Sequence, residues 1–403
     1  MGSVSSVLSK DNLVLLPAGV FLFSLPFTHT IAVRLICLFA AACIVFYQWW
    51  RRPPPTPPCK GPLAFWFVVC FLASMWSIEP DYSWGEFRNE VVYALMTGTV
   101  FYYSTKNEAV WQIWRTILVS AFLVVSLHAI FNYFRLGDWA AAGLVGDRNA
   151  YSTYIVVIAP FLFLTTAQTG IRSRAGKLLW LTIALALITG YLTLNRIMWV
   201  TLMIETAIFV FLYLRKSAVT ATKKRRVRLA IVTAICAVFA VQFFLVSHVG
   251  STQMKKSFSE DPRLHIWSYA LKRMEERPLS GYGYGRGILR RDFRTHFNDP
   301  LHWHAHNMVL NYTMEAGLLG AAALLWLFAA LVREFWKLYR SRHRISWELG
   351  TFGLALLLGI VTKTMTDDIL VRDNALLFWS LVGMCLGLVR HSFTQEVLSG
   401  EAS

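Results

Sequence analysis

Long apolar runs recur along the whole of the 403-residue chain, and they constrain its fold more than any other feature. Each run has about 17 to 25 residues, which is enough for a helix to cross a bilayer core of roughly 30 Å. Charged residues make up 15% of the sequence, whereas an average soluble protein has about 25%. The sequence therefore predicts an all-α integral membrane protein.

Twelve segments are predicted to span the membrane, and together they form one polytopic domain over residues 1–403. The first is interpreted as a retained span, because no small-residue cleavage site follows it. The fourth is the shortest. No internal repeat with a fixed period is evident. The predicted spans are 12–28, 30–50, 62–79, 90–103, 110–134, 151–168, 177–195, 197–214, 229–247, 305–331, 347–365 and 374–391.

The loops between these spans predict the orientation of the chain. Lys and Arg concentrate in alternate loops, most densely at 215–228, and cytoplasmic loops carry such an excess. The short loops on the other side contain acids, as at 79–86 and 367–368. Both termini are therefore expected in the cytoplasm. The same rule accounts for a net charge of +16 without nucleic acid as a partner.

The segment 248–304 is the one long loop on the outer side, and it is basic where the topology rule predicts no such excess. It holds ten Lys and Arg residues against six Asp and Glu residues, with six of the ten His in it or at its end. Two interpretations remain open for this loop. It is either a solvated extramembrane segment or a site for a polyanion beside the membrane.

Part of this loop is predicted to be an amphipathic helix at about 263–276. Asp261-Pro262 supplies a capping residue and a proline for the first turn. Leu264, Trp267, Leu271 and Met274 follow at steps of three and four, so they are expected to pack on the rim of the membrane domain. Arg263 opposes the helix dipole there, which suggests that it meets an anion.

The loop ends in two further motifs. Residues 281–287 alternate Gly with Tyr or Arg and include Arg286. Such glycines let backbone N–H groups approach a phosphate, although alone they are as typical of a turn. His302, His304 and His306 follow at spacings of two. Either they bind a metal, or one of them is a general base. The second is favoured, because acids are sparse nearby. The six Cys form no CxxC pair, so neither disulfides nor a thiolate metal site is expected.

Several ionisable residues outside the loop are also predicted at the outer face. Arg148 precedes the sixth span, and Arg196 lies in the tight turn between spans seven and eight. Lys363, Asp367, Asp368 and Arg372 cluster near the end of span eleven, either as ion pairs or as a site. Glu315 is two turns into span ten, and Glu205 is deep in span eight. Arginines converging on one cavity would suit a diphosphate, because guanidinium binds phosphate oxygens bidentately.

Two of these motifs resemble those of a known family. His306-Asn307, nine residues, Gly317, two residues and Gly320 are similar to the His-Asn-x9-Gly-x-x-Gly signature of the O-antigen ligases. Arg263 and Trp267, followed by Pro-Leu-Ser-Gly-Tyr-Gly at 278–283, resemble the pattern that enters the large loop of that superfamily.

A third motif surrounds Arg196. Leu-Asn-Arg-Ile-Met-Trp at 194–199 is similar to the superfamily's Ser-Arg-Gly turn. Asn and Ile replace its small neighbours, whereas the arginine is the same. The predicted topology of about twelve spans with one large periplasmic loop extends the resemblance to the whole chain.

The resemblance implies a C-type glycosyltransferase in the bacterial inner membrane. It would transfer a glycan from undecaprenyl diphosphate to lipid A–core oligosaccharide, with inversion and with no metal ion or nucleotide as cofactor. His306 would be the catalytic base, because histidine is the commonest general base in enzymes. Arg148, Arg196, Arg263 and Arg286 would stabilise the diphosphate. Asn307, Glu315 and His304 would support them.

Other interpretations of the sequence remain open. His304 is the alternative base, and His306 could instead cap span ten. A polymerase or a protein O-oligosaccharyltransferase of the same superfamily would differ in its acceptor, which one sequence does not reveal. A transporter of anionic lipids would place polar residues deep in many spans, whereas here Glu205 is the main example. A structural scaffold would not need arginines at costly positions.

Overall fold

The computed structural model describes residues 13–51, 56–137, 147–169, 173–217, 220, 222, 262–300, 302–366, 368 and 370–399. These residues form helices and connecting loops and include no strand. The helices are α1 (Leu15–Ser24), α2 (Ile31–Arg51), α3 (Lys60–Met75), α4 (Pro80–Glu86), the π-helical η3 (Phe87–Val92), α5 (Tyr93–Ser104), α6 (Glu108–Leu136), α7 (Arg148–Thr169), α8 (Arg174–Leu192), α9 (Arg196–Lys216), α12 (Pro262–Glu276), α13 (Arg290–Phe297), α14 (Met308–Arg340), α15 (Arg344–Thr364) and α16 (Arg372–Ser399).

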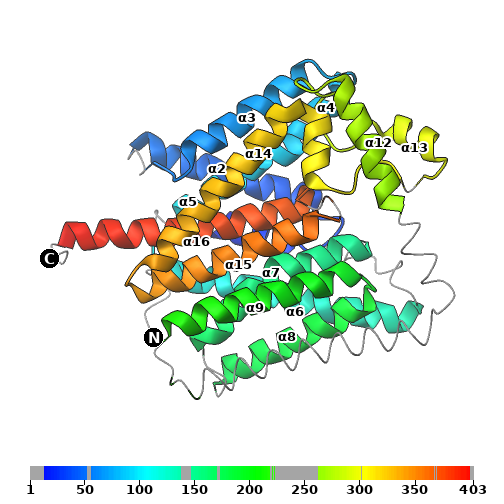
Figure 1. The fold of residues 1–403 in the computed structure, drawn as a ribbon. Coiled ribbons are helices and arrows are strands. Elements are labelled where there is room, and N and C mark those ends of the chain that lie inside the picture. Colours follow the sequence, from blue (N-terminus) through cyan, green and yellow to red (C-terminus); the bar gives the residue numbers. More distant parts are fainter. Residues whose placement is uncertain are drawn as a thin grey trace.

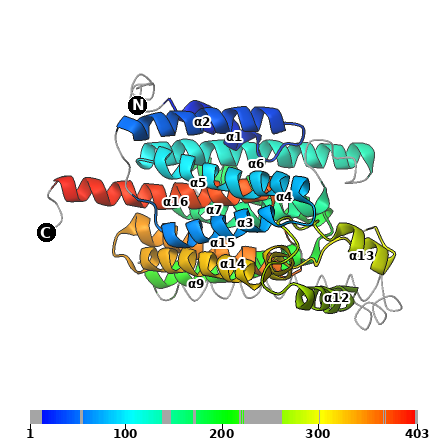
Figure 2. The same cartoon turned by 90° about the horizontal axis from the view of Figure 1, so that it is seen from above.

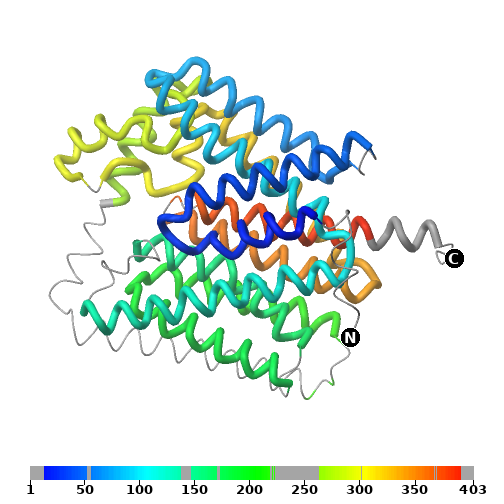
Figure 3. Tube along the Cα trace, turned by 180° about the vertical axis from the view of Figure 1, so that it is seen from behind, coloured from blue at the N-terminus to red at the C-terminus, as the bar shows by residue number. Residues whose placement is uncertain are grey.

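The long helices lie side by side in one bundle, and α12 and α13 lie together beyond one end of it (Figures 1 and 2). The last residues of α16 extend from the opposite end. Seen from behind, the dark blue turn between α1 and α2 lies at the same end as the yellow-green segment 262–300 (Figure 3). We call this end of the bundle the α12–α13 end.

The helices confirm the predicted all-α membrane fold. Eight of the described helices are long and apolar enough to cross a bilayer, and α1 and α3 are shorter apolar helices. Eleven of the twelve predicted spans coincide with a helix. The ninth, 229–247, lies outside the described residues, as do 248–261 of the long loop, including Asp261, and also Asp367.

The predicted fourth span is longer in the structure than in the sequence pattern. α4, η3 and α5 follow one another without a break, so the chain is helical from Pro80 to Ser104. Pro80 begins the helix, where its missing N–H costs nothing. Acidic and polar residues at 79–90 hide this part from a hydropathy pattern. A π-helical turn inside an α-helix frequently marks a functional region, and η3 carries the buried Glu90.

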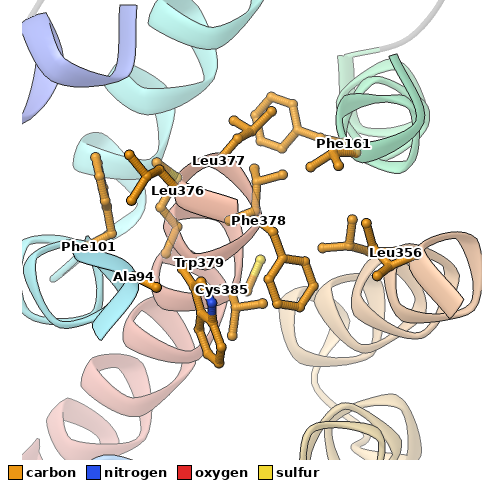
Figure 4. Close-up of a cluster of buried hydrophobic side chains, with 14 of the residues drawn as sticks. Ala94, Phe101, Phe161, Leu356, Leu376, Leu377, Phe378, Trp379 and Cys385 are labelled. Carbon is orange, nitrogen blue, oxygen red and sulfur yellow. The ribbon is translucent and has the colours of Figure 1, made fainter. Parts of the chain in front are cut away.

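The central helix of the bundle is α16, which packs against α5, α7 and α15. Its apolar side chains meet Phe101, Phe161 and Leu356 from the surrounding helices (Figure 4). The backbones of α5 and α16 approach closely, because a Cβ atom at Gly387 would lie 2.2 Å from the Tyr102 carbonyl oxygen. Small residues allow such contacts between membrane helices.

α14 is interrupted at Gly317, and segment 278–283 fills the interruption. Gly317 has φ +67° and ψ −166°, a conformation essentially restricted to glycine. The break frees two carbonyl groups of α14. Met314 O accepts from Tyr282 N at 2.8 Å, and Glu315 O accepts from Gly283 N at 3.0 Å. Leu318 N donates to Pro278 O at 2.8 Å. The His306–Gly320 motif and the segment 278–283 therefore bond to each other at the break in α14, which we call the Gly317 joint.

Replacing Gly317 by alanine is expected to destabilise this joint. A Cβ atom there would lie 2.2 Å from Leu279 O, on a backbone that alanine rarely adopts. We expect the melting temperature of the purified protein in detergent to fall by several degrees, since such strain costs about 1–3 kcal/mol. Gly61→Ala in α3 is the matched control, because nothing lies within 4 Å of its Cβ position. Equal melting temperatures for the two variants would contradict the prediction.

Candidate functional site

A cavity of about 670 Å³ opens at the α12–α13 end, between the first turns of α7 and α16. The turn between α1 and α2 and the loop before α14 complete its wall. We call it the α7–α16 cavity. Its lining residues are Leu25, Pro26, Thr28, Asp147, Asn149, Ala150, Tyr151, Thr153, Tyr154, Arg286, Trp303, His304, His306, Asp368, Val371, Arg372, Asp373 and Asn374.

His306 and His304 both line this cavity, and they differ in what they can do there. His306 is only half-buried, whereas His304 is 2% exposed. The backbone N–H of His306 donates to Nδ1 of His304 at 3.0 Å. Because that N–H can only donate, Nδ1 of neutral His304 holds the lone pair and Nε2 holds the proton. His304 thus has no free basic nitrogen for a substrate, which favours His306 as the base.

The backbone at His306 is held in an unusual conformation. Its φ is +51°, and non-glycine residues with positive φ are uncommon and worth attention. The prediction that span ten begins at 305 is therefore too early, because α14 begins at Met308 with Asn307 as its N-cap. Asn307 Oδ1 accepts from Leu310 N at 3.1 Å, and Asn307 Nδ2 donates to Met365 O at 3.3 Å. Asn307 thus caps α14 and bonds the residue after α15.

A second asparagine, which the sequence analysis missed, also holds this turn. Asn311 is fully buried. Its Oδ1 accepts from Ala305 N at 3.0 Å, and its Nδ2 donates to Asp368 Oδ2 at 2.8 Å. Asn311 therefore connects the His306 turn to the loop between α15 and α16. The sequence offered one indication of this role. Asn311 lies one helical turn after Asn307 in a predicted span, and a buried amide there needs hydrogen-bond partners.

We expect Asn311→Ala to lower the catalytic rate by loosening the His306 turn. The substitution leaves the Ala305 N–H without its Asn311 partner, which costs about 1–3 kcal/mol for a buried group, and it removes one hydrogen bond of the Asp368 carboxylate. The measurement is kcat and KM for each substrate, together with the melting temperature. Asn132→Ala is the control, since Asn132 bonds His128 away from this cavity. Loss of stability without loss of kcat per folded molecule would refute this role.

Arg286 is the one predicted diphosphate ligand that lines the cavity. Its guanidinium donates to Asp368 O at 2.8 Å and lies 5.0 Å from the centre of the Trp303 ring. Arg290 lies 4.9 Å from the centre of the same ring. Trp303, which precedes His304 in the chain, therefore has a guanidinium group on its ring from each of Arg286 and Arg290. This cluster lies close in the chain to His306, the candidate base. Arg286 contacts Asp368 and Trp303, so its position in the wall is fixed.

A further arginine of the cavity is Arg372, at the first position of α16. It is exposed, has φ +49°, and forms no hydrogen bond or ion pair with a described residue. The next residue, Asp373, pairs with Arg34 of α2, which is 3% exposed. This ion pair, in which Arg34 is buried and Asp373 is partly exposed, connects the first turn of α16 to α2. Of the two possibilities left open for Arg372, the structure favours a site over an internal ion pair.

The other predicted arginines do not line the cavity. Arg148 is next to the lining residues Asp147 and Asn149. Arg196 follows Asn195, whose Nδ2 donates to Asn149 Oδ1 at 2.8 Å, so both arginines are close to the rim. Arg263 is exposed near the start of α12, away from the residues that form the cavity wall.

Glu315 and the glycine-rich segment bond within the protein. Glu315 is 3% exposed, and its Oε2 accepts from Gly285 N at 3.2 Å. Gly281 N donates to Arg277 O at 3.1 Å, and Gly287 N donates to Tyr82 Oη at 2.9 Å. These N–H groups are occupied, so the interpretation of 281–287 as a turn is favoured over a phosphate cradle. Glu315 supports the site by fixing this segment.

The amphipathic helix exists, but its buried face differs from the predicted one. α12 ends at Glu276, as the following Arg277-Pro278 suggests, and Trp267 and Met274 pack on a small core around Phe293. Leu264 and Leu271, in contrast, are 62% and 50% exposed. Ile266 and Ala270 are buried instead, in a cluster that includes residues of both α14 and α13. The spacing of three and four fits either face.

Tyr282 fastens α12 to the glycine-rich segment. Its hydroxyl donates to Glu276 Oε2 at 2.8 Å, and Arg273 lies over its ring. Burial raises the pKa of Tyr282 to about 12. The same hydrogen bond, followed by Arg273, lowers the pKa of Glu276. Glu276 therefore supports this attachment above its ordinary pKa, and its contribution is lost as the pH falls through the lowered pKa.

The three histidines before α14 do not converge on one point. His302 lines a separate groove with α12 and α13, whereas His304 and His306 face the α7–α16 cavity, with ring centres 3.9 Å apart. Among the described residues, no three His, Cys, Asp or Glu side chains are grouped as metal ligands would be. The geometry does not favour the three-histidine metal site over the general base.

Residues 181–325 match the family model described as O-antigen ligase. The matched segment contains the His306 turn, Arg286 and the interruption at Gly317. Over this segment the chain is similar to the O-antigen ligase family. The match covers part of α8, all of α9, α12 and α13 and half of α14, together with Arg286, Trp303, His304 and His306 of the cavity wall.

Individual proteins of known name are similar over shorter segments. A Rickettsia prowazekii protein provisionally named a polysaccharide ligase is 32% identical over 89 residues, which are 20% of this chain and 22% of that protein. Its Rickettsia typhi counterpart is 30% identical over the same length and the same shares. The O-antigen ligase of Salmonella typhimurium is 33% identical over 67 residues, or 15% of this chain and 17% of its own. The chain thus matches about a fifth of the length of these relatives.

Proposed function

We propose that the protein is an inverting glycosyltransferase that transfers O-antigen polysaccharide from undecaprenyl diphosphate to lipid A–core oligosaccharide. The observation that carries this proposal is the half-buried His306 in the wall of a cavity that also contains Arg286 and Arg372. A base and two guanidinium groups around one space suit a reaction that deprotonates a hydroxyl and releases a diphosphate. The names of the relatives support a glycosyl-transferring activity.

In this mechanism His306 removes the proton of an acceptor hydroxyl. The acceptor oxygen then attacks the anomeric carbon of the donor sugar from the face opposite the diphosphate, and a new glycosidic bond forms. The bond between the anomeric carbon and the diphosphate oxygen breaks, and its electron pair leaves with the diphosphate. The proton stays on His306 until it passes to solvent. Attack from the opposite face inverts the anomeric configuration.

The arginines stabilise the negative charge that gathers on the leaving diphosphate. Arg372 and Arg286 act from the cavity wall, in the place that Mg²⁺ takes in many other glycosyltransferases. We further propose that Arg148 and Arg196, at the rim near Asn149, contact the outer part of the diphosphate. Arg263 would also stabilise the diphosphate, at the stage when the acceptor approaches. Guanidinium groups suit this task because they remain charged and bind two oxygens at once.

The proposed location follows from the same picture. We propose that the protein lies in the bacterial inner membrane with the α12–α13 end facing the periplasm, and the long apolar helices support a membrane location. The exposed apolar surfaces of α2, for example Ile36, Phe39 and Phe46, would contact lipid. The isoprenoid tail of the donor would lie between the helices at the periplasmic end, where the cavity borders α1, α7 and α16.

The decisive experiment is transfer by the purified protein in lipid nanodiscs. It uses a defined undecaprenyl-diphosphate glycan, lipid A–core as acceptor, and EDTA. Glycan on lipid A–core in the presence of EDTA is the expected result. Longer donor glycans without lipid A attachment would instead identify a polymerase, and a glycosylated protein acceptor would identify an O-oligosaccharyltransferase. Activity that EDTA abolishes and zinc restores would overturn the metal-independent mechanism. Net movement of the lipid across the bilayer without transfer would identify a transporter.

A further inference from the structure

Two hydroxyl groups in the wall of the α7–α16 cavity have no hydrogen-bond partner among the described residues. They are Thr153 Oγ1 and Tyr154 Oη, both on α7. The two residues are 0% and 5% exposed. A buried hydroxyl without a partner costs about 1–3 kcal/mol. The wall of this cavity therefore carries polar groups that the fold itself does not use.

Neighbouring hydroxyls of α7 show that partners are the rule on this helix. Tyr151, in the same wall, bonds Ser126 at 3.0 Å and Thr189 at 3.1 Å. Thr165, deeper in α7, donates to Phe161 O at 2.8 Å, four residues earlier. The corresponding acceptor for Thr153 would be Asn149 O, which Ser152 Oγ occupies at 2.9 Å. Thr153 and Tyr154 differ from these neighbours in that their buried hydroxyl groups have no hydrogen-bond partner among the described residues.

The rest of the cavity wall indicates what kind of ligand fits. Arg372 provides a guanidinium without a hydrogen bond or an ion pair to a described residue, which suits a phosphate group. The hydroxyls on α7 are neutral, and each can both donate and accept. An isoprenoid tail offers them no partner, whereas the hydroxyl and amide groups of a sugar do. The wall thus combines a group for phosphate with groups for a sugar.

We infer that Thr153 and Tyr154 hydrogen-bond the sugar attached to the donor diphosphate and so select which first sugar the protein accepts. This inference rests on the proposed function, because it assumes that the cavity takes a lipid-linked sugar diphosphate. Buried hydroxyls that pair only with the correct substrate discriminate against sugars that leave them unpaired. The structure assigns the two residues to specificity, whereas proton transfer belongs to His306.

The test uses Thr153→Val and Tyr154→Phe, which remove only the hydroxyl groups. Binding is measured in nanodiscs for undecaprenyl diphosphate with no sugar, with one N-acetylglucosamine and with one galactose. Wild type should bind one of the sugar-bearing lipids more tightly than the sugar-free lipid. In each variant, the ratio of the affinity for that sugar-bearing lipid to the affinity for the sugar-free lipid should fall by up to about tenfold, which corresponds to one neutral hydrogen bond. Binding of the sugar-free lipid should not change.

A second measurement separates ligand recognition from a structural role. Since neither hydroxyl is bonded within the described fold, the ligand-free variants should melt at or above the temperature of the wild type. Thr165→Val is the matched control, because it removes a bonded hydroxyl from the same helix, away from the cavity. The control should lower the melting temperature and leave the sugar preference unchanged. A lower melting temperature for Thr153→Val and Tyr154→Phe, with the preference intact, would overturn the inference.

The outcomes also separate this inference from the proposed function. If the wild type binds a sugar-bearing lipid through these hydroxyls but transfers nothing to lipid A–core, the ligase activity is wrong and the inference stands. If the wild type transfers glycan and both variants keep the full sugar preference, the inference alone is wrong. Equal losses of all three lipids would mean that the hydroxyls bind the diphosphate, which also contradicts the inference.

Discussion

Replacing His306 by alanine should lower glycan transfer by about 10²- to 10⁴-fold, the usual contribution of a general base. His306 lines the cavity and is half-buried, so its ring can reach a bound acceptor. The loss should appear in kcat, while the affinity for undecaprenyl-diphosphate glycan stays close to that of wild type. The measurement combines single-turnover transfer with direct binding of the donor lipid in nanodiscs.

His304→Ala is the informative comparison, because it distinguishes the two candidate bases. His304 Nδ1 accepts the N–H of His306, so its loss should disturb the position of His306. We expect a smaller decrease in kcat together with a lower melting temperature. His302→Ala should have little effect, since His302 lines the groove beside α12 and α13. Wild-type transfer by His306→Ala, or a larger loss with His304→Ala, would refute the assignment of the base.

Much of the fold could be predicted from the sequence, because a membrane helix can be recognised from its own residues alone. An apolar run of sufficient length needs no knowledge of its neighbours, so the spans from 110–134 to 197–214 agree with α6 to α9. The segment 80–92 was harder, because Pro80 and its acidic residues interrupt the hydropathy pattern although the chain remains helical. The face of α12 was predicted only in part, since its contacts with α14 and α13 decide that Trp267 and Met274 pack inward while Leu264 and Leu271 do not.

Residues of the candidate site could be predicted only where they belong to a recognisable sequence motif. His306, Asn307 and Arg286 belong to motifs, and the structure brings His306 and Arg286 to one cavity. Asn311 and Asp368 are 57 positions apart, and their hydrogen bond arises only from the packing of α14 against the loop before α16. Thr153 and Tyr154 read in the sequence as ordinary span residues. Whether a hydroxyl is paired depends on neighbours that no local pattern reveals.

Arg372→Ala should be the second most damaging substitution. It removes from the cavity a guanidinium that no described residue pairs with, so the substrate would lose its charge partner. We expect kcat/KM for the donor to fall by about 10²- to 10³-fold, comparable to the loss of one group that stabilises transition-state charge. Arg372→Lys should recover only part of this loss, because an ammonium group cannot bind two phosphate oxygens in a planar fork. The measurement is donor-dependent transfer kinetics at fixed acceptor.

Arg196→Ala is the matched comparison, since Arg196 is also exposed at a helix start but does not line the cavity. We expect a smaller loss from this rim position, with weaker donor binding. The structural assignment of the cavity would be wrong if Arg196→Ala abolished transfer while Arg372→Ala left it intact. Full recovery by Arg372→Lys would mean that a positive charge suffices, without bidentate binding. The φ of +49° at Arg372 makes one more control necessary. Arg372→Asn keeps a residue type that tolerates this backbone, so it should match Arg372→Ala in activity if the guanidinium, and not the backbone, is responsible.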